Sequence, residues 1–312
     1  MARIYENAFF DNSIIPISEA TVNIASSAVL YGLSVYTVFP VNVAESGDLI
    51  AFRIHDHYRR IINSARIIGI DTFEPLWSEE RFINAVKELI RANTISESVF
   101  IRVTVHVTDL LPGTRSRGLS TVLSMFIYEA KSILPQAGAR LKTSLWRRIP
   151  DYAIPSRAKV NGAYINSVLA KQDAIDSGYD DCIFLDTDGH VCELSAANIF
   201  IVRDGVVVTP DTASDILEGI NRKTVIDICS AEAIPTVTRR VDLTELYIAD
   251  EVFAVGTSAF ITPVLEVDKR IVGNGNSWPI SSLLRERCKA LQSGKDPAFM
   301  NLLTVVGKAA PV

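Results

Sequence analysis

The pattern of hydrophobic and polar positions predicts that the first part of the chain alternates strands and helices. Residues 34–43, SVYTVFPVNV, alternate and are rich in β-branched and aromatic side chains, which predicts a strand. Residues 55–68 and 79–92 repeat apolar positions every three to four residues, which predicts two amphipathic helices. Residues 98–107 and 120–130 are predicted strands again. This part of the chain therefore predicts a small domain of mixed strands and helices.

A stretch with proline and glycine, KSILPQAGA at 131–139, interrupts the pattern and predicts a domain boundary. We therefore expect a small α/β domain over 1–130, an interdomain linker over 131–138 and a larger domain over 139–312. The predicted fold class is mixed α and β (α+β) in two domains.

The second part of the chain is predicted to contain hairpins between helices. It begins with a short predicted strand within 141–148 and a helix at about 163–177. Asp188-Gly189 and Asp204-Gly205 each lie between apolar runs, which is a strong hairpin pattern. The remaining predicted elements are a helix at 219–232, a strand at 251–256, a helix at 278–292 and a short helical stretch beyond it.

Composition and charge exclude several classes of function. The chain has 312 residues, of which 48% are hydrophobic and 21% charged, and its net charge is −5. It has no basic block, so we expect no nucleic-acid or membrane partner. It has no apolar run near the ~18 residues of a membrane span and no signal-peptide pattern at the start. Its four cysteines have no CxxC spacing, which predicts free thiols and a cytoplasmic location.

Lys159 lies in the segment RAKVNGAYINSVLA, between the apolar residues Ala158 and Val160. Burial lowers the pKa of a lysine amine and makes it a nucleophile, which suits Schiff-base chemistry. Alternatively, the side chain extends from a strand end to solvent. Spacing alone favours the solvent-exposed side chain, so other residues must decide between the two alternatives. If Lys159 is the Schiff-base nucleophile, we expect it at the buried end of a strand.

Glu193 lies on the strand that follows the first predicted hairpin, between Cys192 and Leu194. If it points inward, the buried carboxylate needs a cation or a proton donor, and a protonated pyridine nitrogen would supply one. If Cys192 and Leu194 are the inward pair instead, Glu193 faces outward on the strand.

Two turns rich in small residues could hold a phosphate. Residues 217–221 open a predicted helix with free backbone N–H groups, and residues 256–258 follow a predicted strand. Tyr164 could donate to a ring oxygen or could be a core aromatic. Ordinary loops and caps also have such patterns. Together, however, these residues provide what pyridoxal phosphate requires: a lysine for the imine, a carboxylate for the ring nitrogen and a phosphate site.

The chain resembles the fold-type IV pyridoxal-phosphate enzymes (D-amino acid aminotransferase-like), and most closely the branched-chain aminotransferase group. The resemblance covers nearly the whole chain and is strongest from Lys159 to Thr257. It implies a small α/β domain and a larger, β-barrel-like cofactor-binding domain. It implies that Lys159 forms the Schiff base and shuttles the proton, that Glu193 pairs with the pyridine nitrogen, and that Tyr164 contacts the ring hydroxyl oxygen. The phosphate and cofactor contacts implied in addition are Arg59, Gly219, Ile220, Asn221, Gly256 and Thr257.

The substrate side departs from the branched-chain pattern. Tyr31-Gly32 begins a segment that resembles YGxxxFEG, but Tyr36, Thr37 and Val38 replace the Phe-Glu-Gly. This triplet is more similar to that of the (R)-selective amine transaminases. Phe100-Ile101-Arg102 resembles the family's Tyr-x-Arg, with the arginine retained and the tyrosine hydroxyl lost. The substrate-side residues that we expect are Tyr31, Tyr36, Val38, Phe100, Arg102, Arg115 and Ser258.

We expect a pyridoxal-phosphate-dependent aminotransferase that works by a ping-pong mechanism between a branched-chain L-amino acid and a 2-keto acid. The main alternative is an (R)-selective primary amine transaminase, or an enzyme with both activities in which Arg115 swings over a carboxylate. D-amino acid aminotransferase and aminodeoxychorismate lyase are weaker alternatives. A non-enzymatic ligand-binding relative is the alternative from a different class.

The resemblance also implies a homodimer or a larger homo-oligomer. His55-x-His57 is the one pattern that could suggest a metal pair. Side chains two apart on a helix diverge, and no carboxylate-rich cluster completes a site, so we expect no metal.

Overall fold

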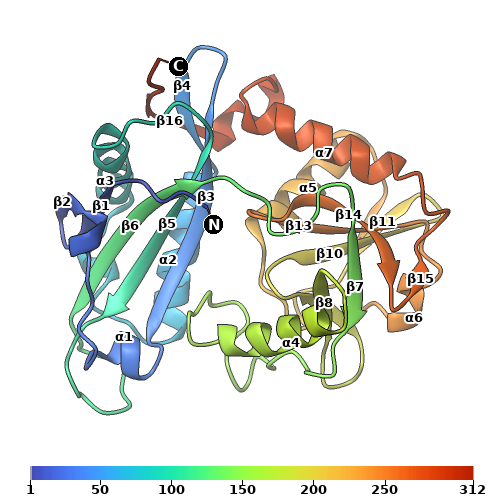
Figure 1. Ribbon diagram of the computed structural model, residues 1–312, viewed down its shortest axis with the longest axis horizontal. Helices are drawn as coiled ribbons and strands as arrows, with labels where there is room; N and C mark the ends of the chain where they lie inside the picture. The colour runs from blue at the N-terminus through green and yellow to red at the C-terminus, as the bar shows by residue number, and fades with distance from the viewer. Residues whose placement is uncertain (1, 312) are drawn as a thin grey trace. The chain divides into compact units, whose positions relative to one another are not determined.

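A computed structural model describes residues 2–311 as two compact units, each with its own sheet (Figure 1). Unit 1 contains the chain up to Lys131, the segment Ala158–Ala163 and the chain from Ala290 onward. Unit 2 contains Ser132–Arg157 and Tyr164–Lys289. The division differs from the predicted one, because residues 158–163 and the C-terminal stretch were expected in the larger domain. Backbone pairing with the first sheet places both in unit 1.

Unit 1 is built on a seven-stranded sheet in which all neighbouring strands are antiparallel. In spatial order its strands are β16 (Leu303–Lys308), β4 (Asp48–Phe52), β3 (Ser34–Val43), β5 (Val99–Val107), β6 (Thr121–Glu129), β1 (Asn7–Phe10) and β2 (Ser13–Pro16). Its helices are α1 (Ser27–Leu30), α2 (Ile54–Ile67) and α3 (Glu79–Arg91), with short 3-10 turns η1 (Ile17–Glu19), η2 (Glu74–Leu76) and η3 (Pro297–Leu302).

The two faces of this sheet have different roles. Side chains alternate along each strand, and one face carries residues such as Phe39 and Ile101, which pack with residues of α2 and α3 in a single core. The other face carries Tyr36, Val38 and Arg102, because Val38 lies directly opposite Arg102 in the register of β3 and β5. Phe100, two positions before Arg102, shares this face, so four of the expected substrate residues lie on the sheet face that does not pack against the helices.

Unit 2 is a nine-stranded sheet whose central part closes on itself. β9 pairs with both β8 and β10, so six strands form a closed barrel. Around this barrel the order is β10 (Asn198–Arg203), β13 (Glu251–Gly256), β14 (Phe260–Val267), β7 (Ala139–Thr143), β8 (Asp181–Leu185) and β9 (Val191–Leu194). The strands β11 (Val206–Thr209), β12 (Thr236–Thr238) and β15 (Arg270–Ile271) extend it, and the helices are α4 (Tyr164–Asp176), α5 (Ile220–Ala231), α6 (Leu243–Leu246) and α7 (Pro279–Gln292).

Most predicted elements are confirmed within two residues. The strands predicted at 34–43 and 251–256 are β3 and β13, and both Asp-Gly pairs lie at hairpin turns. The strand predicted within 141–148 is wrong in its second half. Its pairing stops at Thr143, after which the Ser144 hydroxyl accepts a hydrogen bond from the N–H of Trp146 at 3.0 Å and turns the chain. Strands that were not predicted include β1, β2, β4 and β16.

The four cysteines carry free thiols, and three of them are buried. Within residues 2–311, no helix combines the length and the apolar character that crossing a membrane requires. In the same part of the chain, no group of three or more histidine, cysteine or acidic side chains could hold a metal ion. The two histidines of the His55-x-His57 pattern diverge: His55 is exposed beside Glu79, whereas His57 is buried beside Thr37.

His106 on β5 makes the stability of the protein depend on pH. Burial, with a smaller effect of the Arg102 cation, lowers the pKa of His106 from 6.5 to about 4. The unfolded chain therefore binds a proton first as the pH falls, so stability is lost between pH 6.5 and pH 4. We expect His106→Gln to reduce the loss of unfolding free energy between pH 7 and pH 4.5 by about 2–3 kcal/mol.

Denaturant unfolding at the two pH values measures this effect. His55→Gln, at an exposed histidine in the same unit, is the matched control and should keep the wild-type pH dependence. An unchanged pH dependence in His106→Gln would contradict the assignment.

Candidate active site

Lys159 lies on an irregular segment that runs beside β3, rather than at the end of a strand of the sheet. The N–H of Tyr36 donates to the carbonyl of Lys159 at 3.0 Å, and Val160 forms an isolated antiparallel bridge with Val35. The N–H of Lys159 donates to the Ser64 hydroxyl on α2 at 3.0 Å. Lys159 itself is half-buried and lies outside the strands, so the expectation of a buried strand end is corrected. Backbone hydrogen bonds to β3 and to α2 fix its position.

The side chain of Tyr36 lies between two cations. Its ring centroid is 4.8 Å from the Lys159 Nζ and 3.8 Å from the Arg102 guanidinium carbon. Tyr36 is 5% exposed, so both cation–π contacts are largely shielded from water. Both distances are measured to the same ring centroid, so the Lys159 Nζ and the Arg102 guanidinium carbon can be no further apart than the two distances added together. The structure thus brings three predicted residues together: the reactive amine, the pocket tyrosine and the arginine expected to bind a carboxylate.

Thr37 points to the other face of β3, where it contacts His57 and Arg60. The Arg60 Nη2 donates to the Thr37 hydroxyl at 2.8 Å, and that hydroxyl lies 2.7 Å from the His57 Nδ1. Arginine only donates, so the threonine accepts from Arg60, whose Nη2 also lies 3.3 Å from the His57 Nδ1. His57 is buried, and burial, followed by the charges of Arg60, Lys159 and Arg53, lowers its pKa well below 6.5. The imidazole is therefore neutral.

The structure distinguishes the two neighbouring arginines of α2. Arg59, the predicted phosphate residue, points to solvent with 68% of its side chain exposed and pairs with Asp56 at 3.3 Å. Arg60 is half-buried beside Thr37 and close enough to His57 to affect its pKa, as Lys159 also is. The helix therefore turns Arg60, and not Arg59, toward the neighbourhood of Lys159.

Glu193 points inward from β9 and is 6% exposed, so the outward alternative is wrong. Its Oε1 pairs with the Arg148 Nη2 at 2.8 Å, and its Oε2 accepts from the Asn198 amide at 3.1 Å and from the N–H of Leu217 at 3.2 Å. A carboxylate that accepts from a cation and two neutral donors is stabilised in its charged form. A buried anion of this kind can keep a bound pyridine nitrogen protonated.

The two turns expected to bind a phosphate do meet within unit 2. The Asn221 amide donates to the Thr257 hydroxyl at 3.2 Å, which joins the start of α5 to the turn after β13. Gly219 is the N-cap of α5, and a Cβ there would clash with the Asn198 Oδ1. Packing against Asn198 already requires this glycine, independently of any phosphate.

The other predicted residues are placed as follows. Ile220 is buried at the first position of α5, Gly256 ends β13 and Tyr164 is the first residue of α4, half-buried. Phe100 is fully buried on β5, opposite Tyr128 on β6. Val38 is nearly buried, Ser258 is half-buried in the turn after β13, and Tyr31 and Arg115 are exposed in unit 1.

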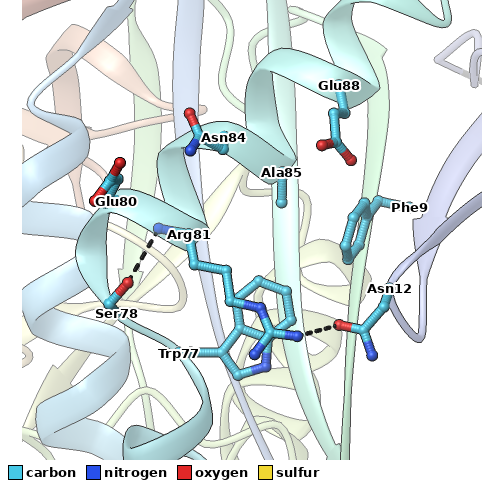
Figure 2. Close-up of a pocket in the computed structure, with 9 residues that line it drawn as sticks. All are labelled: Phe9, Asn12, Trp77, Ser78, Glu80, Arg81, Asn84, Ala85 and Glu88. Carbon is cyan, nitrogen blue, oxygen red and sulfur yellow. Dashed lines mark hydrogen bonds between the residues drawn. The ribbon is translucent and has the colours of Figure 1, made fainter.

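A surface pocket of about 430 Å³ lies elsewhere in unit 1, along α3 (Figure 2). Its lining contains none of the predicted residues. Arg81 lies over the Trp77 ring at 4.5 Å and donates to Asn12 at 2.8 Å, so the cation of this pocket is engaged by two of the lining residues. This pocket is therefore not a candidate catalytic site.

Sequence reasoning missed four residues of these clusters: Arg60, His57, Arg148 and Asn198. For Arg60 a usable pattern existed, because residues three apart share a helix face, as His57 and Arg60 do. The only indication for Arg148 was that a buried Glu193 needs a cation nearby. The sequence does not tell which arginine supplies that cation.

Comparison with known proteins gives the family. A model of the amino-transferase class IV family matches residues 34–267. A probable branched-chain-amino-acid aminotransferase of Aquifex aeolicus is 38% identical over 303 residues, covering 96% of each chain. These matches confirm the aminotransferase resemblance.

Solved structures agree. The branched-chain aminotransferase of Thermoproteus uzoniensis, solved with norvaline, has a TM-score of 0.91 at 33% identity and covers 97% of this chain and 99% of its own. A T.th. branched-chain amino acid aminotransferase, complexed with N-(5'-phosphopyridoxyl)-L-glutamate, has a TM-score of 0.86 at 32% identity with the same coverage. These likenesses confirm the predicted mixed two-sheet fold. The chain belongs to the class IV aminotransferases, in their branched-chain group.

Proposed function

We propose that this protein transfers the amino group of a branched-chain L-amino acid to a 2-keto acid, with pyridoxal phosphate as its cofactor. The observation that carries the proposal is the half-buried Lys159 amine beside Tyr36 and near Arg102, in a chain of this family. The relatives support the substrate class, since the Aquifex aeolicus protein is a probable branched-chain enzyme and the T.th. enzyme holds a phosphopyridoxyl-glutamate.

The residues present fit pyridoxal phosphate. Unit 1 supplies an amine on Lys159 and a guanidinium on Arg60, and unit 2 supplies a buried carboxylate on Glu193. Unit 2 also joins the start of α5 to the turn after β13 through Asn221 and Thr257. An aldehyde, a phosphate dianion and a pyridine nitrogen are the groups that these side chains would hold.

When bound, the cofactor supplies the carbonyl carbon and the electron-withdrawing ring that transamination needs. Lys159 would hold the cofactor through its amine and would carry the proton to and from the substrate α-carbon. Glu193, paired with Arg148, would hold the ring nitrogen. Tyr164 would contact the ring hydroxyl oxygen, and Arg102 would bind the carboxylate of the donor or the acceptor.

We propose that Arg60, in place of Arg59, binds the cofactor phosphate. A guanidinium held by the Thr37 hydroxyl is pre-oriented, whereas Arg59 pairs with Asp56 at the surface. We expect Arg60→Met to raise the dissociation constant for pyridoxal phosphate about 10- to 100-fold, because it loses charge-assisted hydrogen bonds.

Equilibrium dialysis of the two variants provides the test. Arg59→Met is the matched control, one residue away on the same helix, and should change the dissociation constant less than about twofold. A larger loss of affinity in Arg59→Met than in Arg60→Met would restore the original assignment.

Visible absorption tests the proposed reaction. We expect the cofactor-loaded protein to have a visible band that bleaches on addition of L-leucine and does not change with (R)-1-phenylethylamine. Protein without any visible band after cofactor addition would overturn the cofactor assignment and favour a non-enzymatic relative. Bleaching by the amine alone would replace the proposal with the (R)-amine transaminase.

A dual-specificity enzyme is the second candidate, favoured by Tyr36, Thr37 and Val38 in place of Phe-Glu-Gly. Arg115 lies exposed on the loop between β5 and β6, so it is free of packing that would prevent it from swinging over a carboxylate. Bleaching by both leucine and the amine in the same titration would support this candidate.

We propose that the protein is at least a homodimer. Exposed apolar side chains gather around α1, where the N–H of Leu111 donates to the carbonyl of Ala25. Ile24 is 82% exposed and Leu111 73%, and monomeric proteins rarely leave such patches uncovered. A second copy of the chain is the partner that the family resemblance supports.

Sedimentation velocity tests the oligomer. We expect wild-type protein to sediment as a dimer or larger, and Leu111→Asp to shift the population toward monomer, because the interface would bury an unpaired charge. Leu76→Asp changes an exposed leucine of the same unit away from α1 and should leave the distribution unchanged. A monomeric wild type would contradict the proposal.

A further inference from the structure

Asn161, two residues after Lys159, connects two parts of the sheet of unit 1. Its Oδ1 accepts from the Arg102 Nη2 at 2.6 Å, and its Nδ2 donates to the Ser34 hydroxyl at 2.8 Å. Its backbone N–H also donates to the carbonyl of Ser34 at 3.0 Å. One residue therefore joins the start of β3 to the middle of β5.

The contacts fix which way the amide points. A guanidinium has only donors, so the oxygen of the amide must face Arg102 and its nitrogen must face Ser34. Ser34 is 4% exposed and is the first residue of the central strand β3. Because both ends of the amide are engaged, rotation of the Asn161 side chain would lose both hydrogen bonds.

Arg102 is consequently held at two places. Its guanidinium carbon lies 3.8 Å from the Tyr36 ring centroid, and one terminal nitrogen is held by Asn161. A guanidinium carries five N–H donors, so the opposite edge keeps the donor pair that binds a carboxylate in a bidentate manner. The contact with Tyr36 and the hydrogen bond to Asn161 together restrict the orientation of the group.

We propose that Asn161 is a positioning residue that directs the free edge of Arg102 toward the substrate carboxylate and so favours carboxylate-bearing substrates. This inference rests on the proposed function. Asn161 lies on the segment that carries Lys159, so the reactive amine and the carboxylate-binding arginine are placed by the same short stretch of backbone.

Two substitutions separate positioning from charge. Asn161→Ala removes the amide and frees Arg102 to rotate on the Tyr36 ring. Asn161→Asp keeps an acceptor in the same place but adds a negative charge, which pairs with Arg102 and competes with the substrate carboxylate. The aspartate variant should therefore be the weaker binder of carboxylates, although it keeps the contact with Arg102.

Binding of 4-methylvaleric acid to the cofactor-loaded enzyme measures this directly, since this carboxylate has no amino group to react. By calorimetry, we expect the dissociation constant to rise about tenfold in Asn161→Ala and about 100-fold in Asn161→Asp. The affinity for pyridoxal phosphate should change less than about twofold in both. In steady state, the KM for the keto acid should rise while kcat stays close to the wild-type value.

Asn93→Ala is the matched control. Asn93 is a partly buried asparagine of the same unit whose amide is also engaged at both ends: its nitrogen donates to the carbonyls of Asn7 and Leu89, and its oxygen accepts from the N–H of Asn7. It should leave the binding of 4-methylvaleric acid unchanged. Wild-type binding in both Asn161 variants would overturn the inference, and so would equal losses of carboxylate and cofactor affinity.

The failure of the inference can be told from that of the proposed function. A wild-type protein with a visible cofactor band but no effect of the Asn161 variants would overturn only the role of Asn161. A wild-type protein without such a band would overturn the proposed function and, with it, this inference.

Discussion

The pairing of residues 159–161 with β3 is the interaction on which the candidate chemistry depends. The carbonyl of Lys159 accepts from Tyr36, and the N–H of Asn161 donates to Ser34, so the backbone on both sides of Val160 is tied to a central strand. Because a strand alternates its side chains, this register determines that Tyr36 accompanies the lysine. A shift of one residue would present Thr37 or Val35 instead and would separate the amine from Arg102.

Positive charge gathers around this segment. Lys159, Arg60 and Arg102 all lie near Tyr36 or Thr37, and burial together with nearby cations keeps His57 neutral. Like charges held close together destabilise a fold unless anions compensate. A phosphate dianion and a substrate carboxylate are such anions, so binding them should also relieve repulsion within unit 1.

Local patterns were sufficient for most of the elements and for the chemical identity of the candidate residues. Alternation predicted β3, and the Asp-Gly pairs predicted hairpins, because both depend on neighbours in sequence. Long-range contacts could not be predicted in this way. The membership of residues 158–163 in unit 1 depends on their pairing with β3, and the choice between Arg59 and Arg60 depends on the direction of α2 relative to Thr37. The inward direction of Glu193 depended on Arg148, which lies far from it in the chain and on a different segment of unit 2.

The discontinuity of unit 1 has a consequence for its synthesis on the ribosome. Its sheet gains the edge strand β16 only from residues 303–308, and its reactive lysine from residues 158–163, so the N-terminal 131 residues leave the ribosome without either. Until residues 303–308 emerge, the growing chain exposes β4 as an open edge. Folding of this unit should therefore wait for these residues, and the nascent chain should until then be a substrate for chaperones that shield unpaired strands.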